Sequence, residues 1–568
     1  MDRLEKPISA ILDWAGVSPL RTALVILAVG LVVLVPGLAE MPVTDRDEAR
    51  FAQATKQMLE TGDLVDIRFQ DQPRWKKPAG IYWLQAGSAS LFGGVEAPIW
   101  AYRMPSVLAA LLTALLTAWA ARPLIGPRGA VLAGLMMVTT VLMVVEGHIA
   151  KTDAALTASA TAALGAMAHL LLGQGGRGTA LTFWLAIAAA ILLKGPIVPG
   201  IVLLCLTWFW VFGRQRPAFG RFYPLPGLVL VVVLVAPWLI AIWQVSDGAF
   251  FAEALGRDLG AKLTSGQEKH WGPPGLYFGL VWGTLWPWAA LIPVAAVWLW
   301  QNRREDWLRL LAGWVIPFWL VLEIVPTKLP HYVLPLYPAL VIALAGAMLG
   351  GASAARPWLR KLGAVLVAVP GFGLSAGVVV IPLLLSSLTT KGGEALIPST
   401  VSVPALMLAA LALVFIVLAV RAAWTGQAMA QIGASVMAAV LIYPAVLQFG
   451  LPNARGAFPS PAMAEMIARY RPCATGPAFS IGYREPSLVF LTETGLGLTD
   501  PETALAAFTN DPGTMLLIEE RWRDMLGEKI PPSVTRERLA YFNYNRGKTE
   551  AAALLTSDDP RWDACAKP

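Results

Sequence analysis

About thirteen apolar segments, each long enough to cross a lipid bilayer, constrain the fold of this 568-residue chain more than any other feature. A spanning helix needs about 20 apolar residues, because its backbone groups can bond only to one another inside the hydrocarbon. Only 14% of the residues are charged, against about 25% in soluble domains. The chain is therefore predicted to be an α-helical polytopic membrane protein. The expected spans are residues 20–38, 103–121, 129–146, 154–172, 179–194, 196–212, 225–245, 274–300, 308–325, 331–350, 362–385, 400–420 and 428–449.

Short basic clusters mark every second connection between these spans, and the positive-inside rule assigns such connections to the cytoplasm. The same clusters account for the net charge of +7, so we exclude nucleic-acid binding. The N-terminal apolar run has no small-residue cleavage site and is expected to stay in place as an anchor. The basic residues begin with Arg3, Lys6 and Arg21 and recur near 122–128, 177, 214–221, 303–309, 356–361 and 421.

The remaining connections are expected on the outer side: residues 39–102, 147–153, 194–196, 246–273, 326–331, 386–399, and everything after 450. Polar side chains capable of chemistry gather in these connections rather than in the basic ones. This one-sided distribution predicts a single reaction site at the outer membrane–water boundary. The residues concerned are Asp47, Glu48, Lys77, His148, Lys151, Asp153, Lys194, Arg257, His270, Lys328 and His331.

Two regions outside the spans have their own patterns. Residues 47–60 carry apolar side chains at helical spacing and end at Gly62, which predicts a helix lying along the interface. Residues 78–92 are apolar but too short to span, so a half-buried or re-entrant segment is expected. Residues 1–449 are predicted to form the membrane domain, and 450–568 a small α/β domain outside it. There we expect strands at 478–481, 487–491 and 514–518, and helices at 461–470 and 519–527.

Acidic residues follow the first span directly. Asp47 is the stronger candidate for a general base or an acceptor-orienting group, with Glu48 beside it. The structural alternative is that Asp45 or Asp47 caps the interfacial helix, and Asp45 is the better cap. The HIAKTD turn adds Lys151 and Asp153, where Asp153 either faces Asp47 across a cleft or only caps the next span.

Three lysines lie next to prolines at the outer ends of spans: Lys77 in RWKKP, Lys194 in LLKGP and Lys328 in TKLPHY. A lysine is a compact charge that binds phosphate well, although any single one can be a snorkelling anchor. Together they predict a phosphate site, with Arg257 as a further member. His270 is a weaker candidate for a base or metal ligand, since a lone histidine is usually structural. Further candidates are Arg50, Lys76, Tyr82, Lys151 and His331.

The motifs DE-x-R-F at Asp47–Phe51, MLETGD, KP-x-x-YW from Lys77, LLKGP and KLPHYVLPLYPAL occur in order. Over about residues 20–345 the chain resembles the bacterial lipid A aminoarabinose transferases and, more broadly, the GT-C superfamily that includes protein O-mannosyltransferases. The resemblance implies transfer of a sugar from a polyprenyl-phosphate carrier to an acceptor on the periplasmic face. It also implies an essential first-loop aspartate at Asp47 and phosphate-handling lysines at Lys77 and Lys328.

Two positions depart from the pattern. Lys76 occupies the place of the glutamate in the usual EKP, and Phe51 replaces the common tyrosine. A cation at residue 76 is expected to alter contacts with an amino sugar or to remove a metal site.

The expected protein is therefore a GT-C-type glycosyltransferase of the bacterial inner membrane with a periplasmic active site. Its partners are a polyprenyl-phosphate-linked sugar donor, a lipid or glycan acceptor, and membrane lipids. The sequence gives no firm requirement for a cofactor, and it leaves open whether a divalent metal is bound. One alternative is a transporter or flippase of a polyprenyl-linked sugar, although transporters usually carry paired repeats, which are not visible here. Another is a scaffold for envelope proteins. Cys473 and Cys565 are able to form a disulfide if their compartment is oxidising.

Overall fold

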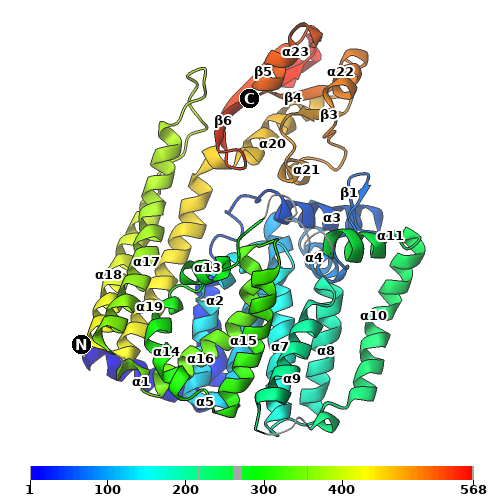
Figure 1. Cartoon of the computed structure of the whole chain (residues 1–568). Helices are drawn as coiled ribbons and strands as arrows, with labels where there is room; N and C mark the ends of the chain where they lie inside the picture. The colour runs from blue at the N-terminus through cyan, green and yellow to red at the C-terminus, as the bar shows by residue number, and fades with distance from the viewer. Residues whose placement is uncertain (1, 215–217, 260–270, 355, 566–568) are drawn as a thin grey trace.

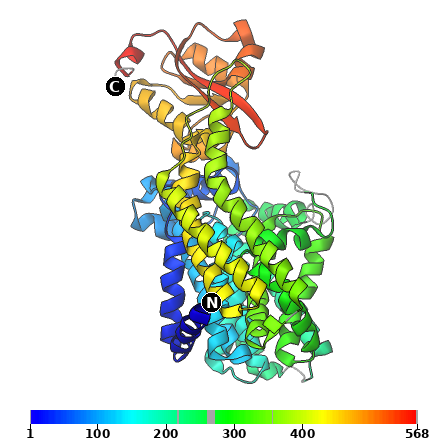
Figure 2. The same cartoon turned by 90° about the vertical axis from the view of Figure 1, so that its left-hand side faces the viewer.

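The protein is a bundle of long helices with a small α/β unit at one end, as its computed structural model shows (Figure 1). The structure describes residues 2–214, 218–259, 271–354 and 356–565, without the side chains of residues 2–4, 255 and 257–259. The C-terminal unit, residues 459–565, stands at the end of the bundle opposite to helix α1 (Asp2–Gly16) (Figure 2). The first interspan loop, defined here as residues 35–98, lies between this unit and the bundle.

Nine helices of the described part are long and apolar enough to cross a membrane, or ten if one bent pair counts as a single span. The bent pair, α13 (Leu276–Thr284) with Trp288–Gln301, which ends in α14 (Ile292–Gln301), turns by 109°. Two further helices, α2 (Pro19–Leu34) and α9 (Ile197–Phe212), are apolar but shorter. The nine are α5 (Ile99–Val138), α7 (Asp153–Leu171), α8 (Arg177–Lys194), α10 with the turn before it (Phe219–Ser246), α15 (Asp306–Ile324), α16 with its first turns (Pro330–Leu349), α17 (Pro357–Ser387), α18 (Val403–Thr425), and α19 with the turns after it (Ala428–Asn453).

The expected spans 103–121 and 129–146 are the two arms of the 40-residue helix α5, continued by α6 (Val141–Gly147). The chain folds back at Gly126, whose φ of 77° is readily adopted by glycine and is followed by Pro127. The arms run antiparallel, because Gly134 lies against Ala114 and Gly147 against Ala110. The thirteen predicted spans exceed the nine that meet a strict length criterion, partly because the two arms of this hairpin are counted there as a single helix.

The first interspan loop contains the helix that the periodicity predicts at 47–60. Helix α3 covers Asp47–Thr61 and ends at Gly62, which has a left-handed φ of 72°. The short helix α4 (Gly80–Leu91) follows and packs against the end of α8. A Cβ on Gly80 would come within 2.7 Å of the Leu192 carbonyl oxygen, so only glycine permits this close approach. Two short strands, β1 (Arg68–Phe69) and β2 (Gln72–Pro73), pair between these helices.

The C-terminal unit contains a four-stranded sheet in the order β3-β4-β6-β5. Strands β3 (Ala478–Ile481) and β4 (Met515–Glu519) are parallel, and β6 (Lys548–Thr556) pairs antiparallel with β4 and β5 (Val534–Asn543). The expected strand at 487–491 is wrong: this run is helix α21 (Pro486–Leu491), which Pro486 starts. Short buried apolar runs cannot be assigned to strand or helix by periodicity alone. The other helices are α20 (Pro459–Tyr470), α22 (Pro501–Asn510), α23 (Glu520–Leu526) and α24 (Arg561–Cys565), with the single turn α11 (Ala249–Phe251) in the bundle.

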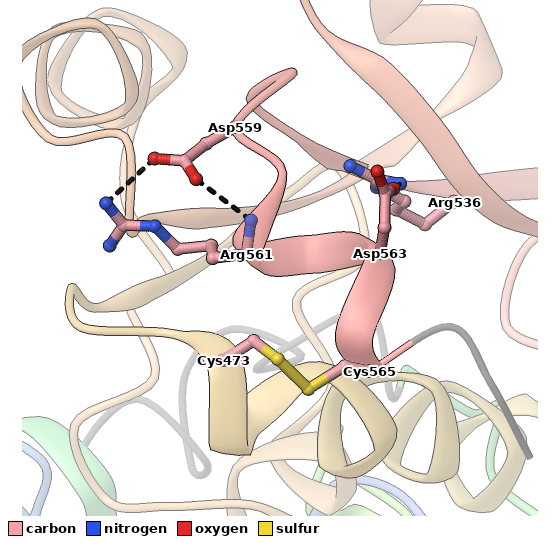
Figure 3. Close-up of a disulfide and its surroundings, with 6 residues drawn as sticks. All are labelled: Cys473, Arg536, Asp559, Arg561, Asp563 and Cys565. Atoms are coloured by element: carbon pink, nitrogen blue, oxygen red, sulfur yellow. Dashed lines mark hydrogen bonds and ion pairs between the residues drawn. A yellow bond between two sulfur atoms is a disulfide. The ribbon is translucent and has the colours of Figure 1, made fainter.

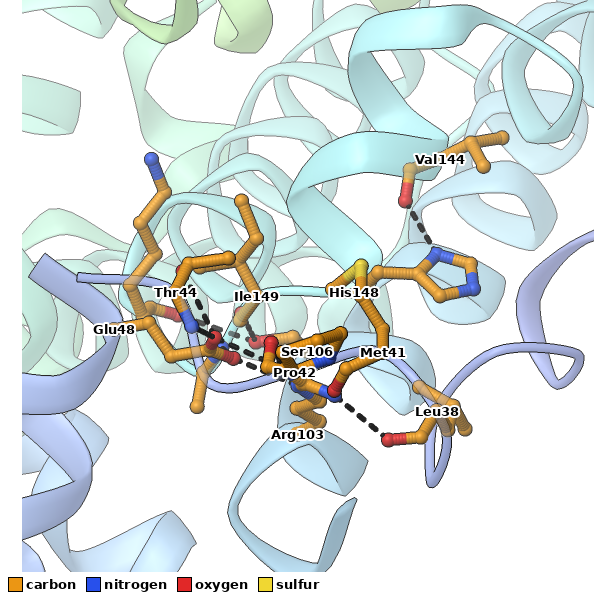
Figure 4. A network of polar contacts seen from close by, with 12 residues as sticks. Leu38, Met41, Pro42, Thr44, Glu48, Arg103, Ser106, Val144, His148 and Ile149 are labelled. Carbon is orange, nitrogen blue, oxygen red and sulfur yellow. Dashed lines mark hydrogen bonds and ion pairs between the residues drawn. The ribbon is translucent and has the colours of Figure 1, made fainter. Parts of the chain in front are cut away.

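A buried ion pair holds α3 against the bundle (Figure 4). Arg103 of α5 and Glu48 of α3 have no exposed side-chain surface, and the guanidinium donates to both carboxylate oxygens at 2.7 and 3.0 Å. Arg103 also donates to the carbonyls of Leu38, Met41 and Pro42, which follow the first span. One side chain therefore ties the end of α2, the start of α3 and the start of α5 together.

The Cys473–Cys565 disulfide joins the two ends of the C-terminal unit (Figure 3). The third cysteine, Cys205, is buried in α9. We expect one thiol per chain to react with maleimide after denaturation without reductant, and three after reduction, as counted by mass spectrometry. The bridge closes a loop of 92 residues, so replacing both bridged cysteines by serine should destabilise the unit by about 2–5 kcal/mol. Three thiols without reductant would contradict the pairing.

Removing Glu48 should destabilise the whole outer end of the bundle. Glu48→Ala leaves a fully buried guanidinium without its anion, which is expected to cost about 3–5 kcal/mol. We expect a clearly lower unfolding midpoint in detergent, measured by tryptophan fluorescence. The matched control is Glu40→Ala, because Glu40 is exposed only a few residues away. Equal midpoints for the two variants would show that the pair does not hold the fold.

Candidate active site

A polar cavity of about 360 Å³ lies where the first interspan loop meets the ends of the bundle helices. Its walls come from five places in the sequence: the start of α3, the loop before α4, the turn between α6 and α7, the end of α8, and the segment before α16. Seven basic and four acidic side chains are among its described lining residues, so the cavity favours an anion. The lining residues are Thr44–Glu48, Arg50, Phe51, Arg74, Lys76, Lys77, Ile149, Lys151–Asp153, Lys194, Thr327, Leu329, His331 and Tyr332.

Asp47 is the first residue of α3, and its exposed side chain faces this cavity. A carboxylate there is favoured by the partial positive charge of the helix N-terminus. The helix is oriented by its neighbour Glu48, which also accepts from the Thr44 backbone and hydroxyl, both at 2.8 Å, and from the Ala150 N–H at 3.0 Å. Glu48 therefore fixes the backbone on which Asp47 stands.

A buried charge network forms the opposite wall. Lys194 donates to Asp153 Oδ1 at 2.5 Å, and Lys151 lies 3.8 Å from Asp153 Oδ2. Lys151 is also bonded to Glu146 at 3.0 Å and lies 3.2 Å from His331 Nδ1. Burial alone would lower the pKa of Lys151, but the carboxylates of Glu146 and Asp153 outweigh it and raise that pKa. Lys151 is thus held as a cation.

His148 secures the turn that carries Lys151 and Asp153. Its ring lies 2.7 Å from the backbone carbonyl oxygen of Val144 (Figure 4). The other ring nitrogen lies 3.0 Å from the carbonyl oxygen of Pro36. Ser106 of α5 donates to the Ile149 carbonyl at 2.8 Å. These contacts join the turn to the end of α2 and to α5, so His148 has a structural place behind the site.

A second cavity, of about 380 Å³, adjoins the first and is mostly apolar. The two share a boundary formed by Lys76, Lys77, Asp153, Lys194, His331 and Tyr332. From that boundary the second cavity runs between spans, along side chains such as Leu156, Leu239, Phe250, Phe318 and Val325. The two cavities together thus have a charged end and an apolar end. This division of polarity is the one that an amphiphile with an anionic head requires.

Asp45 does not cap α3, contrary to the expectation from its position. Its carboxylate turns to the C-terminal unit, where it accepts hydrogen bonds from Ser487 Oγ and, at 3.1 Å, from Tyr544 OH. Burial and the nearby Glu485 raise the pKa of Asp45 to about 6. The residue at the cap position is Arg46, which makes no side-chain cap bond.

The structure brings most of the predicted site residues together, but not all. Lys328 is buried elsewhere: its ammonium donates to the Leu322 and Glu323 carbonyls at the end of α15 and lies in neither cavity lining. Tyr82 is buried beneath Phe51, also outside both linings. His270 and the side chain of Arg257 lie outside the described part of the chain. The predicted residues that share the polar cavity are Asp47, Glu48, Arg50, Lys76, Lys77, Lys151, Asp153, Lys194 and His331.

Among the site residues that sequence reasoning did not single out, Glu146 and Tyr332 lie next to predicted ones. Glu146 lies inside an apolar span, and a lone carboxylate in such a span was itself a signal. Its Oε2 has no hydrogen-bond partner among the described residues. Tyr332 follows His331, lies on the boundary of both cavities, and has the Lys194 ammonium 5.3 Å from its ring centre.

A metal site was left open by the sequence. In the part of the chain that the structure describes, no group of three or more His, Cys, Asp or Glu side chains is arranged to hold an ion. At the position where the resembled transferases have a glutamate, Lys76 lines both cavities. The residues that the structure describes therefore do not supply a ligand set.

The sequence and the fold of this chain are similar to those of the same group of known proteins. A model of the dolichyl-phosphate-mannose-protein mannosyltransferase family matches residues 76–243. Curated relatives named undecaprenyl phosphate-alpha-4-amino-4-deoxy-L-arabinose arabinosyl transferase include those of Aeromonas salmonicida and Edwardsiella ictaluri. They are 32% and 30% identical over 54% and 53% of this chain. The alignments span 56% and 54% of those relatives, so the chain matches about half of their length.

The structural likeness extends over nearly the whole chain. ArnT from Cupriavidus metallidurans, solved in complex with undecaprenyl phosphate, superposes with a TM-score of 0.75 at 20% identity. The superposition covers 96% of this chain and 99% of that one. The apo structure of the same protein gives a TM-score of 0.73. The chain thus has the fold of ArnT over nearly its whole length and resembles the GT-C glycosyltransferases in sequence over about half of it.

Proposed function

We propose that this protein is an integral membrane glycosyltransferase that moves a sugar from a polyprenyl-phosphate carrier to a lipid or other envelope acceptor. The observation that carries the proposal is the adjoining pair of cavities, one polar and lined mainly by cations, the other apolar and lined by side chains of the spans. A polyprenyl-phosphate sugar has the matching division into a charged head and a long hydrocarbon tail. The relatives named above, which are arabinosyl transferases using such a carrier, support the same reaction type.

The carrier phosphate belongs at the boundary of the two cavities. Lys76, Lys77 and Lys194 are the cations on that boundary, and Tyr332 adds a phenol. Breaking the sugar–phosphate bond places more negative charge on the leaving phosphate. Fixed ammonium groups in a site with little water stabilise that charge strongly, because they need no reorganisation during the reaction. We assign no such part to Lys328, whose ammonium serves the end of α15.

Asp47 acts on the acceptor from the other side of the polar cavity. If the acceptor is a hydroxyl, Asp47 takes up its proton or orients it. If the acceptor is a phosphate, no base is needed and Asp47 only positions it. Asp153 is held by Lys194 and Lys151, so its role is to place these lysines. Glu48 is committed to Arg103 and acts as a support. No step requires a metal ion.

The lining also bears on the donor sugar. Lys76 stands beside Lys77 and Arg74 in the polar cavity, and like charges at short range repel a cationic group. We therefore propose that the donor carries a neutral or acidic sugar rather than an amino sugar. Catalysis is assigned to the periplasmic face of a bacterial inner membrane, on the side of the C-terminal unit.

Asp47→Ala should abolish sugar transfer while the protein still inserts and folds. The side chain is exposed, so its removal leaves the buried Glu48 contacts in place. The measurement is mass spectrometry of lipids and envelope glycans from a deletion strain complemented with either form. The product present with the wild type is expected to be missing with the variant. Near-normal product with Asp47→Ala would remove this residue from the mechanism, and transport without a new glycosidic bond would favour a flippase.

Lys194→Ala and Lys77→Ala should weaken carrier binding, because each removes a cation from the cavity boundary. We expect the thermal stabilisation given by undecaprenyl phosphate in detergent to need about 10-fold more lipid, as for a loss of one charge-assisted contact. Lys391→Ala is the control, since Lys391 is exposed on another loop. Equal titration curves for all variants would place the phosphate elsewhere.

A further inference from the structure

The backbone at Arg46 has a strained conformation directly beside Asp47. Its φ is 67° and its ψ is −101°, in a region that residues other than glycine rarely adopt. Such strain persists only where the surrounding structure over-determines the conformation, and it often marks a functional position. Since Asp45, Arg46 and Asp47 are consecutive, whatever holds the backbone of Arg46 also sets the direction of Asp47.

On the helix side of Arg46, the hold comes from the bundle. Glu48 accepts from Arg103, from Thr44 and from the backbone of Ala150, and its side chain has no exposed surface. These bonds fix the first turn of α3. They also reach back across Arg46, because Glu48 accepts from the Thr44 backbone and hydroxyl. The C-terminal unit adds further contacts on that side of Arg46, at Asp45.

The second hold comes from the C-terminal unit. Asp45 accepts from Ser487 Oγ and from Tyr544 OH, each on one carboxylate oxygen. Ser487 is fully buried and is bonded to Ser460 at 2.5 Å, which in turn is bonded to Tyr483 at 2.6 Å. A chain of buried hydroxyl groups therefore leads from the core of the C-terminal unit to the residue before Arg46.

The C-terminal unit is also docked firmly on α3, which makes this hold rigid. Phe490 of α21 packs in one apolar cluster with Ala49 and Ala52 of α3. Lys56 donates to the Phe490 carbonyl at 3.5 Å, and Gln53 donates to Thr494 at 2.7 Å. Because the unit is attached at several points along α3, Ser487 is held at a fixed position relative to Asp45.

We propose that Asp45 is a positioning residue, through which Ser487 and Tyr544 of the C-terminal unit keep Arg46 strained and aim Asp47 into the polar cavity. This inference rests on the proposed function of Asp47 but adds a role for the C-terminal unit, which contributes none of the described lining residues of that cavity. The unit thus acts on the reaction at a distance, through one carboxylate.

Loss of the hold should separate turnover from carrier binding. Without it Arg46 relaxes and Asp47 moves, whereas the lysines of the cavity boundary stay where they are. Small displacements of a catalytic group can lower turnover by about 100-fold. We therefore expect Ser487→Ala with Tyr544→Phe to reduce kcat by about 10- to 100-fold. The titration with undecaprenyl phosphate should change by less than about twofold.

The first test compares this double variant with the wild type in proteoliposomes, using the polyprenyl-phosphate sugars extracted from source membranes as donors. Hydrogen exchange of the backbone amides of residues 44–50 is measured on the same preparations, because the Ala49 and Arg50 amides bond to Thr44 and Arg46. We expect faster exchange in the double variant. Thr494→Ala is the matched control: it removes a contact between the same two units that does not touch Asp45, and should leave kcat within about twofold.

The second test uses pH. The groups facing Asp45 are Glu485, Ser487, Tyr483 and Tyr544 of the C-terminal unit. Because the pKa of Asp45 in the folded protein lies near 6, above its usual 3.8, the folded state binds the extra proton. Burial and Glu485 disfavour the carboxylate more strongly than the hydrogen bonds from Ser487 and Tyr544 favour it, so the docked arrangement of Asp45 gains stability as pH falls through about 6. Exchange at residues 44–50, corrected for its intrinsic pH dependence, should slow over that range in the wild type. Asp45→Asn should show no such step.

The outcomes separate the two proposals. If the wild type transfers no sugar, the proposed function fails, and the exchange measurement alone decides the contact. If the wild type transfers sugar and the double variant shows unchanged kcat and unchanged exchange, the positioning role of Asp45 is refuted. Equal losses in kcat and in undecaprenyl phosphate binding would also refute it, because they would indicate general damage to the site.

Discussion

A guanidinium without access to water is the constraint on which the outer end of this molecule depends. Arg103 has no exposed side-chain surface, and burying an unpaired charge would oppose folding more strongly than most single contacts favour it. The chain satisfies it with Glu48 and three carbonyls of the segment that follows α2. This requirement draws the end of one span, the start of another and helix α3 to a single point. The position of Asp47 follows from that geometry.

The same principle explains why the opposite wall is a network rather than a set of single charges. Glu146, Lys151, Asp153 and Lys194 alternate in sign and lie within contact of one another. A buried carboxylate or ammonium is tolerated when an opposite charge stands beside it. The HIAKTD turn supplies two of these groups, and α6 and α8 supply the others. The charges at the ends of separate helices are therefore interdependent parts of one site.

The sequence predicted the membrane class, the interfacial helix and the convergence of most polar residues, because these follow from hydropathy, helical period and topology. It failed where the direction of a side chain decides. Lys328 lies at the expected end of a span, but its ammonium turns back to the carbonyls of α15. Aspartate is a residue type that often caps helices, yet Asp45 is bound by Ser487, more than 400 residues away in the sequence. The sequence predicts a strand where helix α21 lies, because a run of six residues, five of them buried, has no measurable period. Such features depend on tertiary contacts that no local pattern contains.

At the junction of the two cavities, Lys194 already binds a carboxylate, because it donates to Asp153 in the absence of the carrier. An incoming phosphate must share or take that cation, and a carboxylate left alone in this buried place would be costly. The network removes this difficulty: Asp153 also has Lys151 at 3.8 Å and His331 at 3.6 Å. In the proposed mechanism, Lys151 compensates the charge of Asp153 while Lys194 turns to the phosphate. Under the proposed function, this second cation beside Asp153 is what allows Lys194 to bind Asp153 at rest and the carrier phosphate during the reaction.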